Sequence, residues 1–130
     1  MKVIRMKIQG EIISGDNKGQ YFMSLDVYKV QFMGILGFEP FPGTLNLKID
    51  EESAHKISDL KKKMDIVKGK GNFGDVKLIK AKLNNGSEGA LVFPVKTHHE
   101  PDILELISPL NLRKSLKLQD GDLVTLEILD

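Results

Sequence analysis

The stretch LGFEPFPGTLNLKI, residues Leu36 to Ile49, decides how the chain is organised. After the rigid pair Pro42-Gly43, apolar and polar residues alternate strictly, which predicts a strand from Thr44 to Ile49 with one apolar and one polar face. The polar face carries the hydroxyl of Thr44 and the amide of Asn46 two residues apart. Oxygens of this kind suit a hard cation such as Mg²⁺, which keeps waters and often bridges to substrate phosphates. The same spacing is typical of an exposed strand face, and the spacing alone favours that simpler interpretation.

Further strands are predicted on both sides of this stretch by alternation and by turn residues. Met1 to Ile13 alternates cleanly, Asn84-Asn85-Gly86 is a strong hairpin signal, and Asp120-Gly121-Asp122 turns into an alternating final segment. The remaining expected strands are Met64 to Lys68, Phe73 to Leu83 with a bulge between Leu78 and Ile79, Glu88 to Lys96, and Ile103 to Ile107. The expected helices are Asp26 to Ile35, Asp50 to Lys63, and a helix capped by Ser108, with Pro109 in its first position, that runs to about Leu116.

Together these elements predict a mainly β protein with short helices. Short strands separated by turns favour a compact barrel of about six or seven strands with helical insertions over a parallel sheet. The length of 130 residues suits one domain, residues 1–130, with a single core.

Composition excludes several classes of function. The chain has a net charge of +1, so its total charge gives no reason to expect nucleic acid or an anionic membrane as a partner. It has no cysteine, which excludes disulfides, thiol nucleophiles and cysteine-ligated metals. Its first residues have neither a signal peptide nor a continuous apolar span, and a cytoplasmic location is the default expectation. A monomer is compatible with these features, which leave the oligomeric state open.

Two motifs are formally present but lack the context that their usual chemistry needs. GKGNFG at residues 69–74 matches G-x-G-x-x-G, yet a strand follows where a dinucleotide site needs a helix, so a glycine-rich hairpin is favoured. His98 and His99 are adjacent on a segment expected to be extended, where they point to opposite faces and chelate one ion poorly. Neither a dinucleotide site nor a zinc site is therefore expected.

The loop Gly15 to Gln20 is a better candidate for anion binding. Two glycines flank a short turn whose free backbone amides can form an anion-binding nest, and Lys18 adds positive charge. Taken by itself, the loop is better interpreted as an ordinary surface turn.

A resemblance links these separate features. GFEPFPGTLNLKI, THH at Thr97 to His99, LELISP at Leu104 to Pro109 and DGD at Asp120 to Asp122 resemble the archaeal CTP-dependent riboflavin kinases, over nearly the whole chain. The resemblance implies a cradle-loop β-barrel and transfer of the γ-phosphoryl group of CTP to the 5′-hydroxyl of riboflavin, giving FMN and CDP. It also implies that Thr44 and Asn46 hold Mg²⁺.

The resemblance further assigns residues to the two substrates. Thr97 and Glu105 would contact the flavin, and Glu105 is the candidate general base; its competing interpretation is an outward strand residue between two leucines. Arg113 would pair with phosphate, although without the resemblance a solvated helix charge is preferred. The residues expected to hold the nucleotide are Gly15, Asp16, Asn17, Lys18, Gly19, Gln20, Leu110, Asn111, Leu112 and Arg113.

Two non-catalytic alternatives remain. The ending LKLQDGDLVTLEI also resembles hairpins of small swapped-hairpin DNA-binding regulators, which usually present a basic face. A flavin-binding module without chemistry would bind riboflavin or FMN and leave nucleotides untouched. The balanced charge and the unexplained PGTLN segment favour the kinase over the DNA-binding protein.

Overall fold

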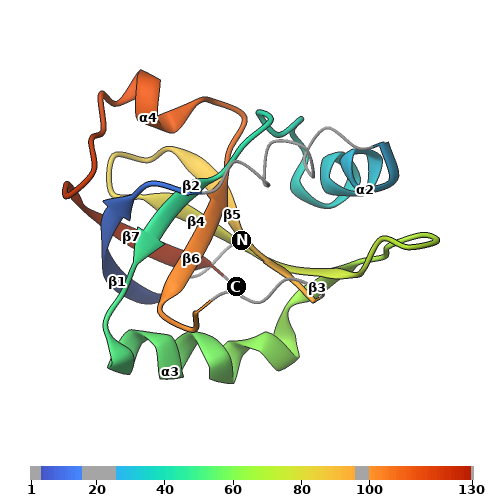
Figure 1. Ribbon diagram of the computed structural model, residues 1–130, viewed down its shortest axis with the longest axis horizontal. Helices are drawn as coiled ribbons and strands as arrows, with labels where there is room; N and C mark the ends of the chain where they lie inside the picture. Colours follow the sequence, from blue (N-terminus) through green and yellow to red (C-terminus); the bar gives the residue numbers. More distant parts are fainter. Residues whose placement is uncertain (1–3, 16–25, 96–99, 130) are drawn as a thin grey trace.

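The computed structural model describes residues 4–15, 26–95 and 100–129 (Figure 1). Its strands and helices follow the alternating and helical patterns of the sequence. The elements in chain order are β1 (Ile4–Ile13), α2 (Asp26–Leu36), β2 (Leu45–Lys48), α3 (Glu51–Leu60), the 3-10 turn η1 (Lys61–Lys63), β3 (Asp65–Val67), β4 (Val76–Leu83), β5 (Glu88–Pro94), β6 (Ile103–Ile107), α4 (Leu112–Ser115) and β7 (Leu123–Leu129).

Six antiparallel strands close into a barrel, in the order β4-β5-β6-β2-β1-β7. Closure comes from pairing of β4 with β7, where Ala81 lies opposite Ile128 and Leu83 lies opposite Leu126. β3 pairs with β4 and extends the sheet beyond the barrel. The predicted mainly β barrel with short helical insertions is confirmed.

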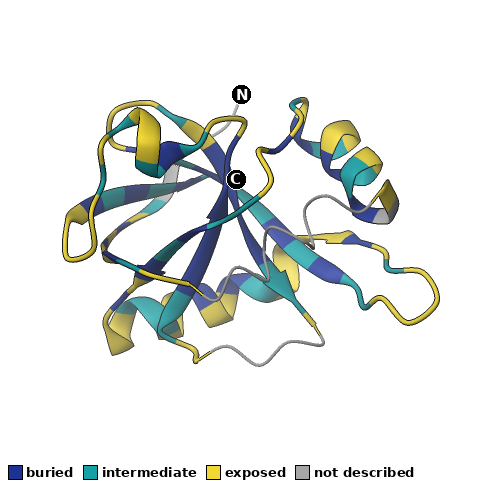
Figure 2. Cartoon of the chain, turned by 45° about the horizontal axis from the view of Figure 1, so that its top comes forward, coloured by how far each residue is buried: buried dark blue, intermediate teal, exposed yellow. Residues whose placement is uncertain are grey.

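The barrel interior is filled by the inward face of each strand. Ile8 and Ile12 of β1 and Leu47 of β2 are buried there, as their alternation predicts, and Figure 2 shows buried residues running along the strands. Gly10 lies in the same row of β1. A Cβ at Gly10 would stand 3.2 Å from Leu47 Cβ, so the absent side chain lets the neighbouring strand pack closely.

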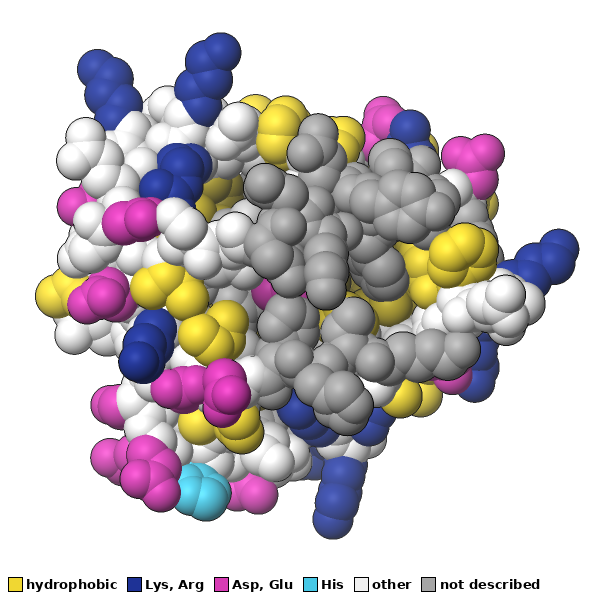
Figure 3. Space-filling view, viewed as in Figure 1, with side chains coloured by type: hydrophobic (Ala, Val, Ile, Leu, Met, Phe, Trp, Pro, Cys, Tyr) yellow, Lys and Arg dark blue, Asp and Glu magenta, His cyan; other side chains and the backbone are white. Residues whose placement is uncertain are grey.

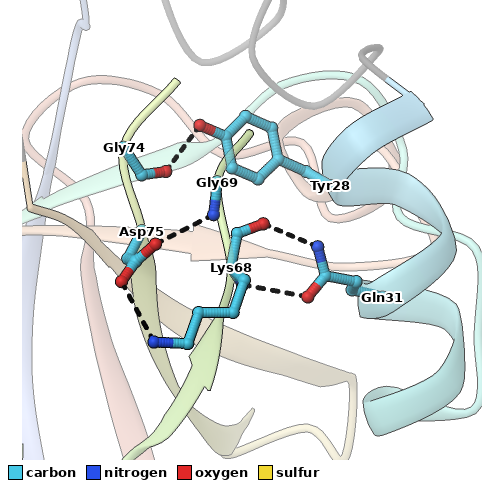
Figure 4. Close-up of polar contacts among 6 residues, drawn as sticks. All are labelled: Tyr28, Gln31, Lys68, Gly69, Gly74 and Asp75. Atoms are coloured by element: carbon cyan, nitrogen blue, oxygen red, sulfur yellow. Dashed lines mark hydrogen bonds and ion pairs between the residues drawn. The ribbon is translucent and has the colours of Figure 1, made fainter. Parts of the chain in front are cut away.

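A second apolar cluster lies outside the barrel wall, beneath α2. Tyr28 and Phe32 of the helix are fully buried in this cluster with residues of β4 and β5. Polar contacts also attach the helix to the β3–β4 hairpin (Figure 4). The Gln31 amide donates to Lys68 O at 2.7 Å and accepts from Lys68 N at 2.9 Å, and Tyr28 Oη donates to Gly74 O at 2.7 Å.

The two clusters explain why the predicted bulge in β4 is wrong. β4 pairs with β5 in continuous register from Val76 to Lys82. Val76 and Leu78 face the outer cluster under α2, whereas Ala81 and Leu83 face the barrel interior. The apolar pattern changes parity because the buried face changes along a regular strand, and no residue is inserted.

The helix predicted to begin after Ser108 begins later. Asn111 is the N-cap of α4, and its side chain accepts a hydrogen bond from Lys114 N at 3.1 Å. The Ser108 hydroxyl instead donates to Glu88 O at 2.9 Å and accepts from Leu110 N at 3.3 Å. The prediction of a Ser108 cap is therefore wrong, because that hydroxyl is used to fasten the end of β6 to β5.

The glycine-rich segment after β3 is a hairpin, as predicted, and not a dinucleotide loop. A Cβ at Gly69 would lie 2.0 Å from the carbonyl oxygen of Phe73, so only glycine fits where the two arms approach. Asp75 Oδ1 accepts from Gly69 N at 2.9 Å across the same hairpin. Separately, no helix among residues 4–15, 26–95 and 100–129 is long and apolar enough to span a bilayer.

Candidate functional site

A pocket of about 600 Å³ lies at the end of the barrel where β1 and β6 finish and β2 begins. Figure 1 shows α4 over this end, while α3 lies at the opposite end. The pocket gathers segments that are far apart in the sequence. Its lining includes the predicted residues Gly15, Thr44, Asn46, Leu110, Asn111, Leu112 and Arg113, together with Ser14, Phe41, Pro42, Gly43, Leu45, Leu106 and Ser108.

The predicted metal pair lies on the wall formed by β2. Thr44 and Asn46 are partly exposed and alternate with buried Leu45 and Leu47. Gly43, with φ of +143°, provides the backbone conformation from which this strand starts. The alternation predicted from the sequence therefore does bring the hydroxyl and the amide into one pocket.

The Asn46 side chain is held against the end of β1. A Cβ at Gly15 would lie 2.2 Å from Asn46 Nδ2 and 2.9 Å from Asn46 Cγ, so the amide occupies the space that any larger residue would take. In the sheet, Asn46 lies opposite Ile13 of β1 and Glu105 of β6. Gly15 thus has a packing role beside the binding role predicted for it.

The donor set fits a magnesium ion completed by water or phosphate. Both oxygens are uncharged, and among the described residues no group of three His, Cys, Asp or Glu side chains is placed to hold a metal. An ion at Thr44 and Asn46 would therefore obtain its remaining ligands, and its charge compensation, from a phosphate-bearing molecule and water.

Arg113 of α4 contributes a positive charge to the lining of the pocket. Its Nη2 donates to Asp120 Oδ1 at 2.8 Å and to Ile13 O at 3.2 Å. Ser14 Oγ donates to the other oxygen of Asp120 at 2.6 Å. These bonds, first from the Ser14 hydroxyl and then from the Arg113 guanidinium, hold the pKa of Asp120 below its usual value.

Ser14 and Asp120 were not predicted as site residues. The sequence analysis singled out Asp120 only as part of the Asp120-Gly121-Asp122 motif, and it did not single out Ser14. Their bond joins residues 106 positions apart, and nothing in the local sequence around either residue indicates it.

Glu105 lies on the outer side of the β6 wall, and it is a buried residue. The residue is 7% exposed, so the competing interpretation of an outward strand residue agrees with its direction but not with an exposure to solvent. It lines a second, smaller hollow of about 230 Å³ with residues that include Phe93 and Lys61, and Lys61 Nζ lies 4.9 Å from the centre of the Phe93 ring. Asn46 lines the larger pocket and its cross-strand neighbour Glu105 lines the smaller one.

The other predicted site residues lie outside the described part of the chain. These are Asp16, Asn17, Lys18, Gly19 and Gln20 of the proposed nucleotide loop, and Thr97 of the proposed flavin site. His55 is exposed on α3, where its Nε2 is 3.8 Å from Glu51 Oε1. This position lies within the helix predicted from Asp50 to Lys63.

The face seen in Figure 3 carries both signs of charge. Lys and Arg side chains gather at the corner over α4, and acidic side chains gather near α3. The positive corner contains Arg113 and exposed Lys114 and Lys117, close to the larger pocket. Positive charge is thus local to this end of the barrel, within a chain of nearly zero net charge.

Comparison with known proteins identifies similar chains over most of this length. The family model for CTP-dependent riboflavin kinases, described as a domain of unknown function, matches residues 12–128. A riboflavin kinase of Methanothermobacter thermautotrophicus is 47% identical over 88% of this chain and 93% of the relative. Those of Ignicoccus hospitalis and Methanobrevibacter smithii are 47% and 46% identical, over 90% and 94% of this chain and 68% and 99% of the relatives.

Proposed function

This chain belongs to the CTP-dependent riboflavin kinase family, and from that membership we propose that it is a riboflavin kinase that uses CTP and Mg²⁺. Residues 1–130 would act as one catalytic domain. The observation that carries the proposal is the pocket of about 600 Å³, because the metal pair and the described part of the nucleotide set line it together. Family membership favours this activity over the DNA-binding barrel and over the flavin-binding module.

The reaction is a phosphoryl transfer with a simple balance of bonds. The riboflavin 5′-oxygen forms a bond to the γ-phosphorus of CTP, the bond from that phosphorus to the β–γ bridging oxygen breaks, and CDP leaves. The hydroxyl proton passes to a base. Such a reaction asks the protein chiefly for positioning and for compensation of charge.

The larger pocket would hold the nucleotide phosphates. Arg113 supplies a planar set of N–H donors suited to phosphate oxygens, and the segment Leu110 to Asn111 completes the wall beside it. Thr44 and Asn46 would hold the Mg²⁺, which would supply positive charge to offset the negative charge of the phosphates. The Gly15 to Gln20 loop would add backbone amides to the same phosphates.

The Asn46–Glu105 pair would set the boundary between the two substrates. Asn46 faces the phosphate pocket, and Glu105 lines the smaller hollow directly across the strand pair. Riboflavin bound on the Glu105 side would direct its ribityl chain toward the phosphates. Glu105 would then orient the 5′-hydroxyl and accept its proton, with Thr97 as a second contact to the flavin.

The test is a product assay with riboflavin, Mg²⁺ and, separately, CTP, ATP, GTP or UTP, in which FMN is measured by chromatography. FMN formed chiefly with CTP is the expected result. FMN formed best with ATP would retain the kinase and overturn the donor, and no FMN with any nucleotide from folded protein would overturn the activity.

The metal assignment is tested by two variants of β2. Asn46→Ala should abolish turnover at ordinary Mg²⁺ concentrations while circular dichroism stays unchanged. Lys48→Ala is the matched control, because Lys48 lies two residues further on the same strand, is exposed, and does not line the pocket. Normal activity of Asn46→Ala, or an equal loss in Lys48→Ala, would contradict the assignment.

A further inference from the structure

Asp120 touches both walls of the larger pocket without lining it. One carboxylate oxygen accepts from Arg113 Nη2 at 2.8 Å and the other accepts from Ser14 Oγ at 2.6 Å. Ser14 and Arg113 both line the pocket, one at the end of β1 and the other on α4. The Asp120 side chain therefore links Ser14, at the end of β1, to Arg113, the cationic residue on α4.

The turn that carries Asp120 is itself fixed to β1. Gly121 N donates to Ile12 O at 2.8 Å, and Ile12 N donates to Asp122 O at 2.8 Å. Gly121 has φ of +93°, and Asp122 Oδ2 closes the turn by accepting from Gln119 N at 2.8 Å. The carboxylate of Asp120 is thus presented to Ser14 and Arg113 from a firmly held backbone.

Stability alone does not account for this arrangement. The side chains of Arg113 and Asp120 are 40% and 56% exposed, and ion pairs this accessible to water contribute little to folding. The effect of the contact on Arg113 is more specific. A free arginine side chain has large rotamer entropy, whereas here Nη2 is bonded to Asp120 and Ile13 O. The Nε and Nη1 groups make no hydrogen bond to residues within the described ranges, so they remain available to an anion in the pocket.

We propose that Asp120 is a positioning residue, which holds Arg113 and Ser14 so that the free guanidinium N–H groups meet the nucleotide phosphates on arrival. The inference rests on the proposed function, because it needs a nucleotide in this pocket. Asp120 acts through Arg113 and does not touch the substrate. Its hydrogen bonds to Ser14 and Arg113 lower its pKa, and it is therefore anionic at neutral pH.

Kinetics of single and double variants test this role. Asp120→Ala should raise KM for CTP about tenfold, because Arg113 then loses its rotamer freedom only when the nucleotide binds, and kcat should change less than about twofold. In an Arg113→Ala background the same change should have almost no further effect on KM. Asp120→Asn keeps an oxygen that accepts from Arg113, so it should restore most of the affinity.

Glu52→Ala is the control for loss of an exposed ion pair. Glu52 pairs with Lys56 on α3, at the end of the barrel away from the pocket, and its removal should leave KM and kcat unchanged. Thermal unfolding of each variant separates a folding defect from a binding defect. If Asp120→Ala does not fold, Asp120→Asn provides the test instead. We expect Asp120→Asn to raise KM for CTP about two- to threefold in the wild-type background and to leave it unchanged in the Arg113→Ala background.

The outcomes separate this inference from the proposed function. Two results would overturn the positioning role and leave the kinase intact. In the first, Asp120→Ala raises KM for CTP by the same factor in the wild-type and the Arg113→Ala backgrounds. In the second, Asp120→Ala leaves KM unchanged although Arg113→Ala binds CTP poorly. An unchanged KM in Arg113→Ala would overturn both the nucleotide site and the role of Asp120.

Discussion

Replacing Gly15 with alanine tests whether glycine is needed there to make room for the Asn46 amide. The added Cβ would lie 2.2 Å from Asn46 Nδ2, whereas ordinary contacts are 3.4–4 Å. Because Gly15 does not have a positive φ, alanine suits its backbone and by itself would stabilise the protein by about 0.4–1 kcal/mol through the unfolded chain. Overpacking of this kind costs about 1–3 kcal/mol. We therefore expect Gly15→Ala to destabilise the protein by about 0.5–2 kcal/mol.

The effect of Gly15→Ala on the free energy of unfolding should change sign when Asn46 is shortened. In an Asn46→Ala background the clash is gone, so Gly15→Ala should stabilise by about 0.4–1 kcal/mol, giving a coupling free energy of about 1–3 kcal/mol between the two positions. Urea unfolding followed by far-ultraviolet circular dichroism on the four proteins measures this coupling. Gly34→Ala in α2 is the control, because nothing lies within 4 Å of an added Cβ and its effect should be equal in both backgrounds.

The refuting result is a Gly15→Ala effect that is the same in both backgrounds within about 0.3 kcal/mol. That outcome would mean that the Asn46 amide does not press against Gly15. If the coupling is present, Gly15→Ala should also reduce FMN formation more than it reduces stability, because the displaced amide is a proposed metal ligand.

Three further predictions follow from other contacts. Glu105→Gln should lower kcat much more than riboflavin affinity if Glu105 accepts the proton, and equal losses in steady-state kinetics would make it only a binding residue. Gln31→Ala removes two hydrogen bonds to the Lys68 backbone and should destabilise the protein by about 1–2 kcal/mol in urea unfolding; no change would show that α2 does not depend on them. The hydrogen bond from the Gly69 N–H and, to a smaller extent, the interaction with Lys68 lower the pKa of Asp75. The contribution of the Asp75 carboxylate to stability is therefore full above about pH 4 and disappears as the pH falls through the lowered pKa. The stability difference between wild type and Asp75→Asn should therefore shrink on acidification, and a difference that grows would contradict this sign.

Local patterns in the sequence predicted most individual elements, because alternation, caps and turn residues act over a few positions. β6 was predicted with its observed bounds, and the hairpin at Asn84 to Gly86 followed from its turn chemistry. The errors arose where tertiary contacts decide. Ser108 was assigned as a helix cap, yet its hydroxyl bonds to Glu88 on a neighbouring strand. The apparent bulge in β4 came from a change of buried face that is visible only once α2 is in position.

The sequence predicted individual residues of the candidate site, but it did not predict that they line one pocket. Thr44, Asn46 and Arg113 were singled out from the sequence, partly by resemblance, and the barrel closure and α4 bring them to one pocket. The support from Ser14 and Asp120 was missed because a contact between positions so distant in the chain has no local signature. Long-range hydrogen bonds behind a pocket are thus the part of a site that sequence patterns describe least.

The pairing of β1 with β7 has a consequence for how this barrel can be joined to other chains. Ile4 lies opposite Leu129, so the described chain enters and leaves the barrel at one point, and β1 then runs its full length before reaching Gly15 and the pocket. A fused domain or affinity tag attached at either side of that point would emerge at the end of β1 remote from the pocket. A linker at that point would therefore be separated from the pocket by the length of β1.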